Sequence, residues 1–473
     1  MLFCSEKFLV FFTLVFALYW ATPWHRLRTW LLLGASFYFY ASWNQWLALI
    51  IGVSTTIDYF VARGMQSSES LRIRKLLLSV TIIGNLSLLC YFKYANFFLH
   101  SVEEALHAVG STAALPVLQV ILPIGISFYT FEAINYGVDV YRRRVPAERN
   151  LAHFMLFITF FPHLVAGPIV RARDFLPQIR QRKHWDWARL QLGAEFFLMG
   201  MFKKVVADRM AMFADPVFAN PEQYRTTAAW LAVLAYALQI YCDFSGYTDM
   251  ALGSAHMLGF KLAKNFNMPY ASANISEFWR RWHISLSSWL RDYLFIPLGG
   301  SRGTSWQTNR NLLITMTLGG LWHGASWTFV IWGVMHGVVL IGHRYFRAFC
   351  EARPRLDAVL LTPPGTALRI ALTFFTVSIA WIFFRATTFT TATVMLGRMF
   401  TAQQGLGPPM AKESLWVLTA VIVAAHVFAL SGVWKKWSLR MPAPILGMSY
   451  AVLLTLTLVL APDAGKAFIY FQF

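Results

Sequence analysis

The stretch EFWRRWHISLSSWLRDYLFIPLGG, residues 277–300, decides how this chain is interpreted. It places arginines, a histidine and an aspartate in an otherwise apolar, aromatic-rich sequence. A second stretch, LGGLWHGASW at 318–327, holds a lone histidine among apolar and small residues. An ionisable side chain at the centre of a bilayer costs roughly 2.5–3.5 kcal/mol on insertion scales, so such residues usually serve function or face a watery cavity. His283 and His323 are therefore the first candidates for a functional site.

The composition defines the class of protein. Of the 473 residues, 57% are hydrophobic and only 13% are charged, whereas soluble domains carry about 25% charged residues. Apolar blocks follow one another along the whole chain, with no polar module between them. The sequence therefore predicts an all-α polytopic membrane protein that forms a single integral-membrane domain over residues 1–473.

The apolar blocks are the candidate membrane helices. A span needs about 20 apolar residues, and several blocks are shorter, so we expect about 11–13 membrane helices, including broken or re-entrant ones. The blocks cover residues 8–19, 29–41, 46–62, 75–91, 117–135, 151–166, 190–206, 228–241, 326–344, 368–384, 415–430 and 445–460.

The distribution of Lys and Arg between the blocks predicts the orientation. Basic residues follow the first, third and fifth blocks, and the connections between them are poor in positive charge. By the positive-inside rule, this places the N-terminus outside and the basic loops in the cytoplasm. The linker 171–189 is also basic, although only block 151–166 separates it from the previous basic loop. Either that block enters and leaves on one side of the membrane, or it is buried in protein. Gly167-Pro168 favours a broken helix, and the alternative is a miscounted helix.

The net charge of +19 is spread over short loops. Topology and contact with anionic membrane lipid account for charges in such positions, so we expect no nucleic-acid partner. A basic cytoplasmic face would also attract a polyanionic ligand.

At helical spacing, the run from Glu277 predicts one helix with two stripes. Such a helix either lies at the membrane interface or lines a polar cavity inside the bundle. Its aromatic and apolar stripe is Phe278, Trp282, Leu286, Trp289 and Tyr293, and its polar stripe is Arg280, His283, Ser287 and Arg291.

The second histidine, His323, lies between glycines that allow a substrate or a neighbouring helix to approach its ring closely. A neutral imidazole in a dry pocket is suited to act as a general base toward an acceptor hydroxyl. The structural alternative is a histidine that is hydrogen-bonded across two helices.

Several further stretches, taken together with these two, resemble a known family. They are LPIGISFYTFEAINYGVDVYR (122–142), FPHLVAGPIVR (161–171), YCDFSGYTDMALG (241–253), NFNMPY (265–270) and FIYFQF (468–473). In this order they are similar to the membrane-bound O-acyltransferase (MBOAT) family, in its bacterial alginate O-acetyltransferase branch. The resemblance is strongest over 122–343, and the C-terminal part, 366–473, is less distinctive.

The resemblance implies site residues. His323 matches the near-invariant active-site histidine of the family, and His283 matches a second position that holds asparagine or histidine. Arg280 and Arg291 are candidates for binding the donor or stabilising charge. Four residues fall in a further motif with a substrate- or donor-binding role, namely Tyr241, Asp243, Tyr247 and Asp249. No metal is expected.

The resemblance also implies an activity. It predicts an MBOAT-like fold with a central two-sided funnel, in the bacterial inner membrane, that moves acetyl from cytoplasmic acetyl-CoA for O-acetylation of an exported polysaccharide. Acetyl-CoA is the donor, no cofactor stays bound, and periplasmic acetyltransferase partner proteins complete the transfer. The polymer stays open between alginate, cellulose, another exopolysaccharide and peptidoglycan, as does the choice between direct transfer and a covalent intermediate. The alternatives are a non-catalytic transporter or flippase, or a scaffold subunit.

Overall fold

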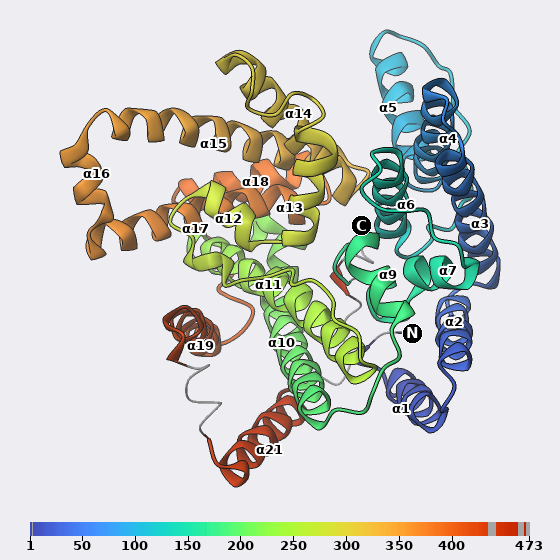
Figure 1. The fold of residues 1–473 in the computed structure, drawn as a ribbon. Coiled ribbons are helices and arrows are strands. Elements are labelled where there is room, and N and C mark those ends of the chain that lie inside the picture. The colour runs from blue at the N-terminus through green and yellow to red at the C-terminus, as the bar shows by residue number, and fades with distance from the viewer. Residues whose placement is uncertain (2, 166, 434–440, 462–467, 470–473) are drawn as a thin grey trace. The chain divides into compact units, whose positions relative to one another are not determined.

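The computed structural model describes residues 1, 3–165, 167–433, 441–461 and 468–469. Within these residues the chain is helical, and the only paired extended backbone is an isolated bridge between Tyr224 and Leu406 (Figure 1). The all-α prediction is confirmed.

The chain divides into two compact units. Unit 1 comprises residues 1–197 and 248–263, and unit 2 comprises residues 198–247 and 264–473. The long helices α10 (Trp187–Ala219) and α11 (Thr226–Met257) contribute residues to both. The expectation of a single integral-membrane domain stays a prediction.

Seven helical segments of the described residues are long and apolar enough to cross a membrane. The chain is therefore a multi-pass membrane protein, as predicted. Helices α1 (Glu6–Ala21) and α2 (His25–Ala41) are apolar but shorter, with 16 and 17 residues. The total of about 11–13 membrane helices, the funnel and the orientation of the N-terminus stay predictions. The seven segments are Gln45–Ser67, Leu71–Ala108, Thr226–Met257, Trp327–Glu351, Pro363–Arg385, Lys412–Ser431 and Ala443–Leu460.

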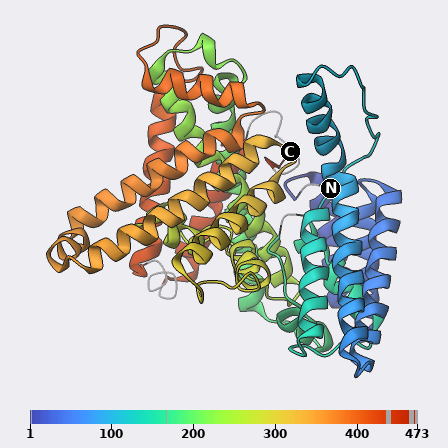
Figure 2. The same ribbon diagram turned by 90° about the horizontal axis from the view of Figure 1, so that it is seen from above.

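Unit 1 is built on three helices that pack against one another, α3, α4 and α6. They carry blue to teal colours in Figure 2. Helix α4 continues through a π-helical turn, Cys90–Tyr94, into α5, which the sequence analysis missed. The helices of this unit after α2 are α3 (Gln45–Ser67), α4 (Leu71–Leu89), α5 (Ala95–Ala108), α6 (Ile126–Tyr141), α7 (Leu151–Thr159), α8 (Phe161–Leu164) and α9 (Ala172–Arg180).

The predicted helix over 117–135 begins later than expected. Helix α6 starts at Ile126, directly after Gly125, whose φ of +76° is left-handed. A Cβ at Gly125 would overlap the carbonyl oxygen of Leu164. The helical start at 117 is therefore wrong, because this close backbone approach requires a glycine in a non-helical conformation.

The block 151–166 is a broken helix, as the Gly167-Pro168 pair suggested. Helix α7 has 9 residues and α8 has 4, and a nine-residue helix is only about 13 Å long. After the break, Arg180 of the second basic segment pairs with Glu148 of the first. The two basic segments thus contact each other. This contact favours a block 151–166 that enters and leaves on one side of the membrane over a miscounted helix.

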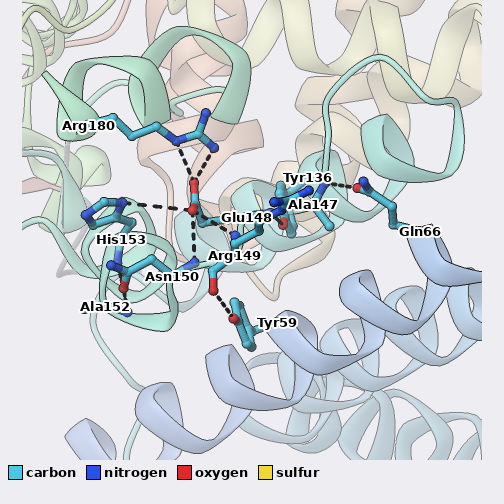
Figure 3. A network of polar contacts seen from close by, with 10 residues as sticks. All are labelled: Tyr59, Gln66, Tyr136, Ala147, Glu148, Arg149, Asn150, Ala152, His153 and Arg180. Carbon is cyan, nitrogen blue, oxygen red and sulfur yellow. Dashed lines mark hydrogen bonds and ion pairs between the residues drawn. The ribbon is translucent and has the colours of Figure 1, made fainter.

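Figure 3 shows the polar network that holds this meeting point. The Glu148 carboxylate accepts hydrogen bonds from Arg180 and from the backbone N–H groups of Arg149 and Asn150. The Tyr136 hydroxyl accepts the Glu148 N–H at 2.8 Å. Burial alone would raise the pKa of Glu148, but the Arg180 and backbone hydrogen bonds outweigh it and lower this pKa below its usual value.

Unit 2 contains a tightly packed helix pair, α14 and α15, and α15 leads through the short α16 back along α17 (Figure 1). The close packing depends on Gly320 and Gly333, because a Cβ on either would overlap a carbonyl oxygen of the facing helix. The helices of this unit after α11 are α12 (Ile275–Arg281), α13 (Ile284–Leu290), α14 (Ser305–His323), α15 (Trp327–Glu351), α16 (Pro354–Leu361), α17 (Pro363–Arg385), α18 (Phe389–Phe400), α19 (Lys412–Ser431) and α21 (Ala443–Leu460).

Candidate active site

The run from Glu277 does not form one helix. Helix α12 ends at Arg281 and α13 begins at Ile284, and His283 between them has φ +42° and ψ +55°. Residues 291–295 then form a π-helical turn. The prediction of a single helix with two stripes is therefore wrong.

The break is stabilised by Asn265 of the NFNMPY stretch. Its backbone carbonyl accepts the N–H of Ile284 at 2.9 Å, and its side-chain oxygen accepts the N–H and the hydroxyl of Ser285 at 3.2 and 2.6 Å. These bonds satisfy N–H groups that a new helix start leaves without intrahelical acceptors. Two motifs of the sequence thus bind each other, and His283 is held in the turn between them.

The left-handed backbone explains the choice of residue at position 283. Asparagine, aspartate and histidine are enriched several-fold in this conformation over other non-glycine residues. The family resemblance implies asparagine or histidine at this position, and both satisfy this backbone requirement. A non-glycine residue held in this region is also typical of functional sites.

The His283 ring is fully buried in unit 2. Phe244 of α11 contacts it edge-on, with ring centroids 4.7 Å apart, and Trp322 lies at 5.9 Å. His283 lies in the connection between α12 and α13, outside the candidate membrane spans. Burial lowers its pKa to about 3, so the ring is neutral at physiological pH.

His323 is the last residue of α14 and is also buried. Its ring lies 5.0–5.2 Å from the rings of Trp322, Trp332 and Phe384. The close approach of α14 to α15 and the packing of α17 thus supply an aromatic wall around this histidine.

The structure brings the two predicted histidines together. Their ring centroids are 6.3 Å apart. The two imidazole rings are therefore neighbours, in surroundings of aromatic rings that strengthen electrostatic interactions.

The two arginines lie differently from His283. Arg280 is exposed and donates a hydrogen bond to Ser276 at 2.9 Å. Arg291 is 62% exposed and pairs with Asp292 at 2.7 Å. The break at His283 and the π-helical turn remove the expected common stripe, and a role of the arginines in binding the donor stays a prediction.

Three residues of the further motif lie in unit 2. Tyr241 is buried and packs its ring 6.5 Å from that of Trp282, the neighbour of His283. Tyr247 stacks on Phe468, and Asp243 contacts Lys204 and Ile469. Asp249 belongs to the part of α11 in unit 1. Substrate- or donor-binding roles for these residues stay predictions.

Sequence reasoning missed a buried charge cluster and most of the aromatic wall. The Lys204 ammonium lies 2.8 Å from both Asp208 and Asp243. A lysine inside the apolar block 190–206, with a carboxylate four residues later, was a signal for it, because an ionisable group in such a block needs a partner. The aromatic wall had no comparable signal, since aromatic residues occur throughout this chain.

A buried histidine pair inside a multi-pass helical protein is a candidate functional site. Residues 5–370 match the MBOAT, membrane-bound O-acyltransferase family. The chain belongs to this family and is an O-acyltransferase.

Curated relatives cover most of the chain. A probable alginate O-acetylase, AlgI, of Azotobacter vinelandii is 43% identical over 92% of this chain and 85% of its own length. The corresponding probable alginate O-acetylase of Pseudomonas aeruginosa is 44% identical over 85% of this chain and 75% of its own. A peptidoglycan O-acetyltransferase of Helicobacter pylori is 39% identical over 76% of this chain and 71% of its own.

Proposed function

We propose that this protein is a membrane O-acetyltransferase that takes acetyl from cytoplasmic acetyl-CoA and supplies it for O-acetylation of an exported polysaccharide. The observation that carries the proposal is the buried pair of His283 and His323, 6.3 Å apart. The alginate O-acetylases and the peptidoglycan O-acetyltransferase among the relatives support an acetyl donor and a cell-envelope glycan. Periplasmic partner proteins complete the transfer, and the protein works in the bacterial inner membrane.

The two histidines have different roles in the reaction. His323 removes the proton from the acceptor hydroxyl while its oxygen attacks the thioester carbonyl. The C–S bond then breaks, and His323 returns the proton to the departing sulfur. His283, which is neutral, donates an N–H hydrogen bond to the oxyanion formed at the carbonyl. The aromatic wall excludes water, so the thioester is transferred rather than hydrolysed.

The family assignment favours an enzyme over the transporter and the scaffold. The buried histidine pair supports the same choice, because neither alternative requires two histidines in one buried site. Among the candidate polysaccharides, alginate is the first choice as the acetylated polymer, since two of the three relatives described above are named for it.

The test is thiol release from acetyl-CoA by the purified, detergent-solubilised protein, with and without the periplasmic partner and the polysaccharide. Wild type is compared with His323→Ala and His283→Ala. His100→Ala is the control, because the His100 side chain is 70% exposed in unit 1. Loss of release in both histidine variants, with His100→Ala active, is the expected result. A folded wild-type protein that neither binds nor cleaves acetyl-CoA would overturn the proposal and favour a transporter or scaffold.

A further inference from the structure

The described C-terminal residues, Phe468 and Ile469, are buried against α11 in unit 2. The other residues of the FIYFQF stretch, 470–473, lie outside the described part of the chain. Ile469 donates its backbone N–H to the Asp243 carboxylate at 2.7 Å. The Phe468 ring stacks on Tyr247 with centroids 4.2 Å apart and lies 6.0 Å from Phe244.

Asp243 thus has two different partners. One carboxylate oxygen faces the Lys204 ammonium at 2.8 Å, and the other accepts the Ile469 N–H. Asp208 faces the same ammonium at 2.8 Å. Lys204 therefore compensates the charge of a carboxylate whose second oxygen is left to bind the backbone of the C-terminal segment.

The contacts continue from this anchor to the active site. Phe244, the neighbour of Asp243, contacts both the Phe468 ring, at 6.0 Å between centroids, and the His283 ring, at 4.7 Å. A shift of Phe468 removes the support behind Phe244. A displacement of about 1 Å at a catalytic group can cost a hundred-fold in rate.

We propose that Asp243 is a positioning residue, which anchors Phe468 and Ile469 so that Phe244 holds the His283 ring in place for acyl transfer. Phe468 and Ile469 then support the His283 side of the site through Phe244. The effect on turnover rests on the proposed function, whereas the effect on the position of His283 does not.

The chain offers a matched control. Asp243→Ala and Asp208→Ala each remove one carboxylate from Lys204, but only Asp243→Ala also releases Ile469. We expect kcat to fall roughly ten- to a hundred-fold in Asp243→Ala, with KM for acetyl-CoA within about two-fold of wild type, and a much smaller loss in Asp208→Ala. Asp243→Asn keeps an oxygen for the Ile469 N–H, so it should recover most of the lost kcat.

The ring contact is tested separately. Phe468→Leu keeps an apolar side chain but loses the stack on Tyr247, and it should lower kcat as Asp243→Ala does. Tyr247→Phe keeps the stacked ring and Tyr247→Leu removes it, so kcat should be lower in Tyr247→Leu than in Tyr247→Phe. Thermal unfolding and gel filtration in detergent establish that each variant is folded.

A labelling experiment reads the position of His283 without turnover. The reagent is diethyl pyrocarbonate, and modified histidines are identified by peptide mass mapping. His163 in unit 1 and His336 in unit 2 are the internal references, since both are buried. We expect His283 to be modified about ten-fold faster in Asp243→Ala than in wild type, with His163 and His336 unchanged, because only a local opening exposes it.

The outcomes separate the two proposals. Faster labelling of His283 in Asp243→Ala but not in Asp208→Ala supports the anchor, even if wild type lacks turnover and the proposed function fails. Equal effects of Asp243→Ala and Asp208→Ala on His283 labelling would overturn the anchor. Faster labelling of all three histidines would also overturn it, since that is general unfolding.

Discussion

His283 and His323 lie with their ring centroids 6.3 Å apart, and two different backbone arrangements bring them there. His323 ends a helix that packs closely on its neighbour through Gly320 and Gly333. His283 occupies a left-handed turn that Asn265 stabilises from outside the run. Each backbone arrangement can be changed without removing a histidine, so the position of the two rings and their role in the reaction can be tested separately.

The left-handed backbone at position 283 predicts a ranking of substitutions. His283→Asn should keep the thermal stability of wild type, because asparagine adopts this conformation readily, whereas His283→Val should lose about 1–2 kcal/mol. Thermal unfolding of the detergent-solubilised variants measures this. Equal stability of the two variants would show that the backbone does not restrict this position.

The aromatic wall predicts that chemistry and packing at position 323 can be separated. His323→Phe retains a ring against Trp332 and Phe384, so it should unfold near the wild-type temperature. His323→Ala leaves a cavity, which costs about 2–4 kcal/mol. Both should reduce thiol release by about 10²–10⁴-fold, the contribution of a general base. Substantial activity in His323→Phe would exclude His323 as that base.

The close helix approach predicts strong effects of single methyl groups. Gly320→Ala and Gly333→Ala should each destabilise the protein by about 1–3 kcal/mol, because the added Cβ overlaps a carbonyl oxygen of the facing helix. Gly342→Ala in α15 is the control, since nothing lies within 4 Å of its Cβ position. It should be neutral or stabilising by about 0.5–1 kcal/mol. Chemical or thermal unfolding of the three variants gives the comparison.

The network around Glu148 predicts a pH dependence of stability. The folded-state pKa of Glu148 is lowered below the usual 4.5. The ionised Glu148 carboxylate therefore contributes fully to the free energy of unfolding above pH 4.5, and this contribution is lost as the pH falls through the folded-state pKa. Glu148→Gln should destabilise the protein at pH 7 by about 1.5–3 kcal/mol, the range for hydrogen bonds to a charged group.

Thermal unfolding from pH 7 down to pH 3 measures this loss in both proteins. The difference in unfolding temperature between wild type and Glu148→Gln should disappear as the pH falls below about 4.5. A difference that stays constant over this range would show that the Glu148 charge does not stabilise the fold. Glu69→Gln is the matched control, because the Glu69 side chain is 89% exposed and pairs with Arg143 at the surface.

Several properties of this protein follow from the sequence by itself. The apolar blocks predicted an all-helical, multi-pass membrane protein because hydropathy and length are local properties of a segment. Gly167-Pro168 indicated that the block 151–166 is broken, although the break lies earlier, at Phe160 between α7 and α8. The histidines in two motifs indicated a candidate site, because ionisable groups in such a chain are rare enough to be informative.

Only the tertiary structure decided how the site is assembled. The turn at His283 depends on acceptors from Asn265, and the anchor of Ile469 on Asp243 joins residues 226 positions apart. The helical periodicity of 277–293 predicted one continuous helix, because periodicity describes which residues share a face and not which distant groups compete for their N–H bonds. Hydrogen bonds and ring contacts across such separations are set by packing, so they appear only when the helices are in place.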